Sequence, residues 1–261
     1  MGITKEAYLI KKSLQQNEDL KTFSKENFCY RCYRLTRMCL CSSIEPFESS
    51  INFVILMHPM EAKKEKLGTG RLSKAILKNA QIIVGVDFTD DLAVNQLIAM
   101  GNCFILYPGE DAINISNHQN LPSFIPHLEV RPTVFVIDGT WPCAKKMMRE
   151  SKNLHDLPKI SFDFTEESEF QIKEQPSKFC LSTIESIHRV LKLVEPYTRP
   201  ENVQFLDQFK SLFATMVQVQ IDCASNPSLS SYRNQKKGYS KPSERKRSTK
   251  WDKRSILFIK K

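Results

Sequence analysis

The chain has 261 residues, a formal net charge of +9 and 41% hydrophobic residues. This length is enough to bury the core of one large α/β domain or of two modest ones. No apolar run reaches the length that spans a bilayer, and the first residues lack the apolar segment of a signal peptide. The sequence therefore predicts a cytoplasmic protein without a membrane partner.

The positive charge is concentrated at the C-terminal end. The segment after Ser231 contains 12 of the 38 Lys and Arg residues but only two acidic residues, so the rest of the chain is nearly neutral. Tyr232, Tyr239 and Trp251 lie among these charges. Basic residues with interspersed aromatic rings can neutralise phosphates and stack on bases. A solvated, low-complexity terminus explains the same composition, and both interpretations stay open.

Hydrophobic periodicity predicts an alternation of strands and helices after an amphipathic or solvated helix at 4–22. Strands are expected at 51–57, 81–87, 103–107, 133–137 and 159–163, and helices at 71–79, 90–100, 142–151, 183–195 and 200–223. The segment 109–131, which contains prolines, is predicted to be a long functional loop. This order is typical of an α/β fold, with a mostly parallel sheet and helices on both faces.

Four of the eight cysteines form two close pairs near the N-terminus. A Cys-x-x-Cys pair and a Cys-x-Cys pair on a tight hairpin can close a tetrahedral four-thiolate site. Zinc is the preferred metal, and four protein ligands leave no open position, so its role would be structural. An iron–sulfur cluster and two disulfides are the alternatives. The predicted ligands are Cys29, Cys32, Cys39 and Cys41.

The strand expected at 133–137 ends in a polar turn. Asp138, Gly139, Thr140 and Trp141 follow it, and then Pro142 stands at a first helical position. In open parallel sheets, ligands bind at the carboxyl ends of strands, next to helix N-termini with unpaired N–H groups. Asp138 is therefore a candidate general base, a substrate-positioning group, or an N-cap partner with Thr140. Trp141 would stack on a base or anchor the turn.

The strand expected at 51–57 leads to a second polar segment. His58 follows it, and Gly68, Thr69, Gly70 and Arg71 begin the next helix. Small residues allow close approach of the backbone, and the Arg71 guanidinium can bind a carboxylate or phosphate. The spacing excludes a Walker A phosphate loop. His58 is either catalytic or structural.

The Asp138-x-Thr140-Trp141 motif resembles the signature of the DTW-domain family, whose characterised members are tRNA-uridine aminocarboxypropyltransferases that use S-adenosylmethionine. The cysteine pairs, Thr69–Leu72, Leu157-Pro158, Gln175-Pro176 and Leu181–Glu185 match further blocks in the family's order. The resemblance implies a SPOUT-like domain whose C-terminal part threads a trefoil knot. The expected division is a helix and zinc knuckle at 1–48, a catalytic domain at 49–225 and a basic tail at 226–261.

The resemblance also implies a reaction and a set of site residues. The 3-amino-3-carboxypropyl group of S-adenosylmethionine would pass to nitrogen 3 of a tRNA uridine, releasing methylthioadenosine. The candidate catalytic residues are Asp138, Thr140 and Trp141. Those for cofactor binding are Leu106, Tyr107, Pro108, Gly109, Gly139, Leu181, Ser182, Thr183 and Glu185. Those for substrate RNA are Lys63, Lys64, Arg71, Lys145, Lys146, Arg149 and Lys173. Lys173 stands where the family often has an arginine, and a lysine keeps the charge but cannot make the bidentate contact of a guanidinium.

Two other functions stay open. A SPOUT-type RNA methyltransferase would use the same binding site and release S-adenosylhomocysteine. A non-enzymatic zinc-knuckle protein would bind RNA through the cysteine cluster and the basic tail, without S-adenosylmethionine and without any role for Asp138.

Overall fold

The computed structural model describes residues 28–32, 34–64, 68–124, 131–163, 168–170 and 180–225. The predicted helix at 4–22 and the basic tail lie outside these residues. The strands are β1 (Phe28–Cys29), β2 (Arg34–Leu35), β3 (Asn52–Met57), β4 (Gln81–Val84), β5 (Cys103–Leu106), β6 (Ile113–Asn114), β7 (Thr133–Asp138) and β8 (Lys159–Ser161). The hairpin β1–β2 is antiparallel, and the other six strands form a parallel sheet in the order β4-β3-β7-β5-β8-β6.

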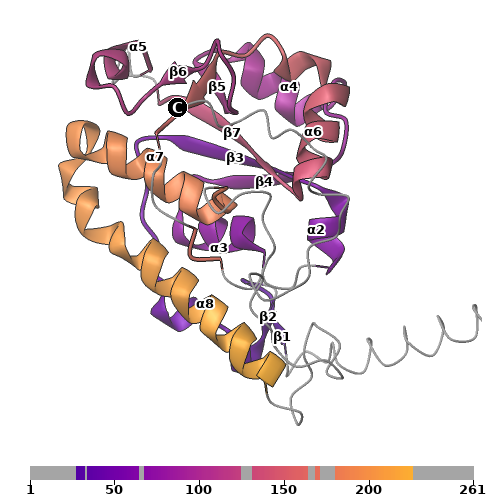
Figure 1. Ribbon diagram of the computed structural model, residues 1–261, viewed down its shortest axis with the longest axis vertical. Coiled ribbons are helices and arrows are strands. Elements are labelled where there is room, and N and C mark those ends of the chain that lie inside the picture. The colour runs from indigo at the N-terminus through magenta and orange to yellow at the C-terminus, as the bar shows by residue number, and fades with distance from the viewer. Residues whose placement is uncertain are drawn as a thin grey trace, which may run out of the picture.

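Helices cover both faces of this sheet, as the sequence predicts (Figure 1). The α-helices are α2 (Pro59–Lys64), α3 (Thr69–Ile76), α4 (Leu92–Ala99), α5 (Leu121–Phe124), α6 (Trp141–Glu150), α7 (Thr183–Thr198) and α8 (Asp207–Ser225). The 3-10 helices are η2 (Thr36–Met38), η3 (Cys41–Ser43), η4 (His118–Asn120), η5 (Lys152–Leu154) and η6 (Pro200–Phe205). Within the described residues, no helix has both the length and the apolar character needed to cross a bilayer.

The two-residue period of β7 divides its side chains between two cores. Val134 and Val136 are buried with α3, α7 and α8, whereas Phe135 is buried with Met147 of α6 and with α4. Because alternate residues of a strand face the same side, Asp138 at the end of β7 lies on the side of α3 and α7. The strand therefore aims its terminal carboxylate away from the helix that follows it in sequence.

Several predicted boundaries are wrong. The segment 109–131 contains β6, η4 and α5 in its described part, because Asn114 and Asn117 make local side-chain hydrogen bonds that form short turns. The expected helix at 200–223 is divided into η6 and α8, since Pro200 starts a 3-10 turn. Helix α7 continues beyond Pro196 to Thr198, where the Thr198 hydroxyl donates to the Val194 carbonyl over 3.0 Å. Helix α2 was not predicted at all.

The segment after the cysteines belongs to the larger core. Leu40, Ile44 and Phe47 are buried with residues of α7 and α8. The ring of Phe47 stacks on Phe205 at a centroid distance of 5.3 Å and meets Phe209 edge-on at 6.4 Å. The cysteine-bearing segment is therefore anchored to the helices that cover one face of the sheet.

The buried His188 of α7 predicts a pH-dependent stability. Its ring stacks on Phe209 at 5.7 Å, and burial, together with the charges of Lys210 and Lys192, lowers its pKa from 6.5 to about 4. The unfolded state therefore binds the proton first as the pH falls. Above pH 6.5 we expect this group to leave the free energy of unfolding unchanged with pH. As the pH falls from 6.5 to 4, the group should lower the free energy of unfolding by up to about 3 kcal/mol. Denaturant titrations at several pH values measure this dependence. The variant His188→Phe should lose the decrease in the free energy of unfolding between pH 6.5 and 4. The same decrease in both proteins would contradict the role assigned to His188.

Candidate functional site

Asp138 lies at the centre of the carboxyl edge of the sheet. It ends β7, is paired with Met57 at the end of β3, and is only 6% exposed. The hydroxyl of Thr183, the first residue of α7, donates to its Oδ1 over 2.6 Å. The short charge-assisted hydrogen bond holds one carboxylate oxygen against the start of α7. Asp138 and Thr183 were predicted for different roles, and the structure brings them into contact.

The backbone of Gly70 lies close to the other carboxylate oxygen of Asp138. It lies in the first turn of α3, and a Cβ atom there would be 2.5 Å from Asp138 Oδ2 and 3.0 Å from the side chain of Ile55. Both distances are shorter than van der Waals contact permits, so only glycine fits without a shift. Asp138 is thus enclosed between the first turns of α3 and α7. The sequence pointed to small residues in this segment and did not identify Asp138 as their neighbour.

His58 lies next to Asp138 at the end of β3. Its backbone N–H donates to the Asp138 carbonyl over 2.8 Å, and its Nδ1 accepts from the Met60 backbone N–H at 3.2 Å. The side chain is 8% exposed, and a Cβ atom on Gly139 would lie 3.4 Å from that of His58. These contacts join the ends of β3 and β7 and hold the His58 ring against the start of α2.

The Thr140–Trp141 turn leads away from this carboxylate. Thr140 is the N-cap residue of α6, and its carbonyl accepts from the Ala144 N–H over 2.8 Å. Trp141 is half-buried and begins α6, whose buried side chains pack on the opposite face of the sheet from α7. Asp138 Oδ1, which accepts from the Thr183 hydroxyl, points to α7 rather than to α6.

Glu185 holds the start of α7 in place. Its carboxylate accepts from the backbone N–H of Ser182 at 2.7 Å and from the Ser182 hydroxyl at 2.6 Å. It also accepts from the hydroxyl of Ser168 and from the backbone N–H of Glu169, at 2.8 Å each. This capping arrangement ties residues 168–170 to α7 and positions Thr183 toward Asp138.

The predicted cofactor loop at the end of β5 lies on the same edge of the sheet. Leu106 pairs with Val136 of β7, so the loop that follows runs beside the end of that strand. Burial raises the pKa of Tyr107, and its backbone N–H donates to the Ile160 carbonyl over 3.2 Å. The structure thus gathers the ends of β3, β5 and β7 and the start of α7 around one edge, as parallel topology requires. Leu181 is half-buried beside Ser182 at this same end.

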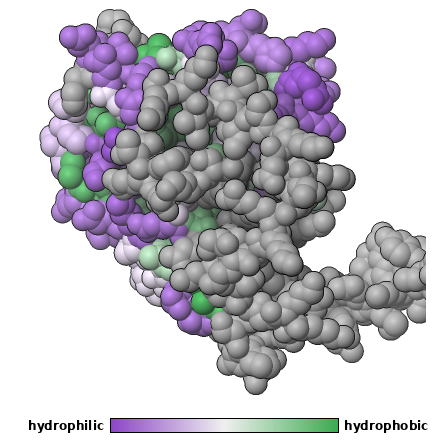
Figure 2. Space-filling view, viewed as in Figure 1, coloured by the Kyte–Doolittle hydropathy of each residue, from purple (hydrophilic) through white to green (hydrophobic). Residues whose placement is uncertain are grey.

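The candidate RNA-binding residues are more widely spread. Arg71 donates to the Ala62 carbonyl over 2.8 Å and thereby links α3 to α2. Arg149 is 70% exposed and pairs with Glu150 at 2.7 Å. Lys145 and Lys146 are exposed on α6, and the surface over this helix in Figure 2 is hydrophilic. Lys63 and Lys64 belong to α2, where the structure describes only their backbone, and Lys173 lies outside the described residues.

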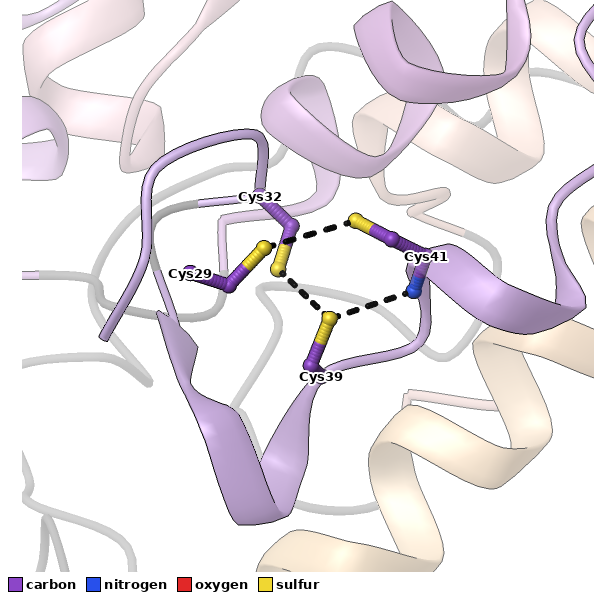
Figure 3. Close-up of side chains that lie close together, drawn as sticks. All are labelled: Cys29, Cys32, Cys39 and Cys41. Atoms are coloured by element: carbon purple, nitrogen blue, oxygen red, sulfur yellow. Dashed lines mark hydrogen bonds between the residues drawn. The ribbon is translucent and has the colours of Figure 1, made fainter. Parts of the chain in front are cut away.

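The four cysteines converge as predicted. Their sulfur atoms lie within 4.8 Å of one another, with 3.8 Å between Cys29 and Cys41 and 3.7 Å between Cys32 and Cys39 (Figure 3). A tetrahedron with Zn–S bonds of 2.3 Å has edges of about 3.8 Å, so the sulfur atoms fit a zinc ion. The Cys41 backbone N–H also donates to Cys39 Sγ at 3.4 Å. This geometry can hold a metal.

The electrostatics of the cluster favour a bound cation. Backbone hydrogen bonds from Cys32 and Arg31 lower the pKa of Cys29 to about 6, whereas burial raises the pKa of Cys32 and of Cys41. A bound cation would stabilise the thiolate forms of Cys32 and Cys41 and so oppose the effect of burial.

A parallel sheet with helices on both faces and a buried carboxylate at its carboxyl edge defines an α/β protein, and in such folds ligands bind at that edge. The DTW domain family profile matches residues 26–221. The chain belongs to the DTW-domain family, as its motifs predicted.

The relatives share one activity in their names. The tRNA-uridine aminocarboxypropyltransferase 2 of Drosophila melanogaster is 29% identical over 190 residues, which cover 70% of this chain and 72% of that protein. The mouse protein of the same name is 32% identical over 175 residues, or 64% of this chain and 56% of the relative. The tRNA-uridine aminocarboxypropyltransferase A of Arabidopsis thaliana is 21% identical over 209 residues, or 71% and 79%. No solved structure matches the chain. The predicted enzyme class, a transferase, agrees with these names.

Proposed function

We propose that this protein transfers the 3-amino-3-carboxypropyl group of S-adenosylmethionine to nitrogen 3 of a uridine in tRNA, in the cytoplasm. The observation that carries the proposal is the buried Asp138 carboxylate, held by Thr183 and enclosed by Gly70 at the carboxyl edge of the sheet. Relatives named for this activity share the family to which the chain belongs. The Asp138-x-Thr140-Trp141 motif that defines this family is therefore built around a carboxylate that tertiary contacts hold in place.

The reaction requires a nucleophilic ring nitrogen. Nitrogen 3 of uracil attacks the γ-carbon of the methionine moiety, the bond from that carbon to sulfur breaks, and methylthioadenosine leaves. The proton of nitrogen 3 must pass to a base, and we assign that role to Asp138. Thr183 keeps the carboxylate in one orientation, which lowers the cost of aligning base and substrate. Positioning the uridine without accepting the proton is the second role open to Asp138.

The binding roles follow from the same edge of the sheet. We propose that S-adenosylmethionine binds to the loop Leu106–Gly109, to Gly139 and to the Leu181–Glu185 segment, since these lie near the ends of β5 and β7. Trp141 would stack on adenine or uracil, next to Thr140 at the start of α6. We also propose that the C-terminal part forms a SPOUT-like trefoil knot. The connection from β8 to α7 passes through 164–167 and 171–179, which lie outside the described residues.

The tRNA would lie across the outer surfaces of α2 and α6. Lys145, Lys146 and Arg149 give α6 an exposed basic side, and α6 begins directly after the Asp138 turn. Lys63, Lys64, Arg71 and Lys173 complete the proposed RNA contacts. Phosphate contacts of this kind position a nucleic acid without reading its sequence.

The test is transfer of label to unmodified tRNA by the full-length protein. S-adenosylmethionine labelled in the carboxyl carbon should label the tRNA, and donor labelled in the methyl group should leave its label in methylthioadenosine. Mass spectrometry of the digested tRNA should find the group on nitrogen 3 of uridine. Methyl label in the tRNA would instead identify a methyltransferase, and RNA binding without donor binding would identify a non-enzymatic protein.

Zinc content is a separate prediction. We expect the purified protein to contain one zinc ion per chain, bound by Cys29, Cys32, Cys39 and Cys41, because their sulfur spacing matches zinc–thiolate geometry. Elemental analysis measures this content. The variant Cys39→Ser should lose the zinc and unfold at lower temperature, because the segment that carries the metal packs in the main core.

The matched control is Cys180→Ser, which changes a half-buried cysteine outside the cluster and should keep its zinc. Iron and inorganic sulfide in the wild-type protein, or no metal in it at all, would overturn the zinc assignment.

A further inference from the structure

Arg34 is a fully buried cation next to the cysteine cluster. It lies in β2 and is only 2% exposed, and its Nε and Nη1 atoms have no hydrogen-bond partner among the described residues. No carboxylate of the described chain forms an ion pair with it. A buried charge without a counter-charge is strongly destabilising, so this guanidinium requires an anion nearby.

The hairpin places Arg34 against the metal-binding residues. In the antiparallel pair of β1 and β2, Arg34 is directly opposite Cys29. Residues directly opposite in such a pair have Cβ atoms about 4.5–5.5 Å apart, with side chains on the same face. Arg34 also lies between the two cysteine pairs in sequence, two residues after the buried Cys32.

The charge of a loaded site explains this arrangement. Four thiolates around Zn²⁺ carry a net charge of −2, and a partly buried dianion is costly to desolvate. One adjacent guanidinium reduces the net charge to −1, and its N–H groups can donate to sulfur. Among the described residues, only the thiolate forms of these sulfur atoms would give this guanidinium a counter-charge.

We propose that Arg34 is a positioning residue of the metal site, which supplies the internal counter-charge that lets four thiolates bind a divalent cation at this partly buried cluster. The proposal rests on the four-cysteine site proposed above and assigns a role to a residue outside its ligands. It makes metal binding and the burial of Arg34 mutually dependent. The negative charge of the zinc–thiolate complex stabilises the buried guanidinium, and the guanidinium in turn stabilises that complex.

The experiment measures zinc affinity of the full-length protein by competition with a chromophoric chelator. We expect Arg34→Met to weaken zinc binding roughly 10–100-fold, the effect typical of removing a residue that supports metal ligands. Arg34→Gln keeps N–H donors without charge and should lose nearly as much, whereas Arg34→Lys keeps the charge and should recover most of the affinity. Arg131→Met is the control, since Arg131 pairs with Glu48 at the surface and should have no effect.

A second measurement separates this role from simple packing. Thermal unfolding with and without zinc gives the stabilisation due to the metal, which depends on affinity. We expect this increment to shrink in Arg34→Met, with the zinc-free variant at least as stable as zinc-free wild type, because an unpaired buried charge has been removed. Cobalt substitution, read by its thiolate-to-metal absorption band, should show four sulfur ligands in every variant that binds metal.

Each contrary result has a distinct meaning. If Arg34→Met and Arg34→Gln bind zinc as tightly as wild type, or if Arg34→Lys binds as weakly as Arg34→Met, Arg34 supplies no counter-charge and the inference is overturned while the zinc site stands. An equal loss of stability with and without zinc would reduce Arg34 to a packing residue. If wild type binds no zinc at any concentration tested, the metal site and the role of Arg34 both fall.

Discussion

We expect Asp138→Asn to slow aminocarboxypropyl transfer to tRNA by roughly 10²–10⁴-fold, the usual contribution of a positioned general base. The amide has nearly the same shape and can still accept the hydrogen bond that Thr183 donates to Oδ1, so the enclosure by α3 and α7 should persist. It cannot accept the proton of uracil nitrogen 3. Single-turnover transfer of labelled carboxypropyl group measures the loss, and equilibrium dialysis with S-adenosylmethionine shows whether donor binding is retained.

The pH profile separates the two roles of Asp138. If Asp138 accepts the proton, the residual activity of Asp138→Asn should rise toward high pH, where uridine loses its own proton to solvent. If Asp138 only positions the uridine, the loss should be the same at every pH. Full transfer activity in Asp138→Asn, with intact donor affinity, would show that this carboxylate does neither.

Gly70→Ala should have the second largest effect. The added Cβ would lie 2.5 Å from Asp138 Oδ2 and 3.0 Å from Ile55, so either the carboxylate or the first turn of α3 must move. We expect roughly 1–3 kcal/mol lower stability from overpacking. We also expect about 10²-fold slower transfer, because a displacement near 1 Å at a reacting group has that effect. Transfer kinetics and chemical denaturation on the same preparation measure both.

Gly101→Ala provides the matched control. Gly101 has a φ of +80° and open space around its Cα, so alanine there strains the backbone without touching a neighbour. It precedes β5, at the amino edge of the sheet and away from Asp138. A stability loss with unchanged transfer is expected for Gly101→Ala. If Gly70→Ala kept wild-type transfer, Asp138 would not depend on the close approach of α3.

Several elements of the fold were predictable because their signals are local. The strands β3, β5 and β7 are continuous apolar runs that end in polar turns, and α6 carries Pro142 in its first turn, as helix rules predict. The two 3-10 helices η4 and η6 were missed because side-chain hydrogen bonds and a proline override the hydrophobic pattern there. The four-cysteine cluster was predictable from spacing alone, since all four cysteines lie close together in the chain, within residues 29–41.

The candidate site was only partly predictable. Asp138 was identified from the turn that follows β7, and Thr183 from its place at a helix start. Their 2.6 Å hydrogen bond spans 45 residues, and no local pattern encodes it. The role of Gly70 was equally hidden, because it depends on which helix covers the side of β7 that carries Asp138.

The sequence by itself determined the class of fold, the four-cysteine cluster, the family and the carboxylate at the end of β7, because each depends on residues close together in the chain. Only the tertiary structure decided what surrounds that carboxylate. Both faces of β7 are apolar, so its alternation could not show whether Asp138 would face α6 or α7. The order of strands and the packing of α3 and α7 settled this, and with it the contacts of Thr183 and Gly70 that hold Asp138.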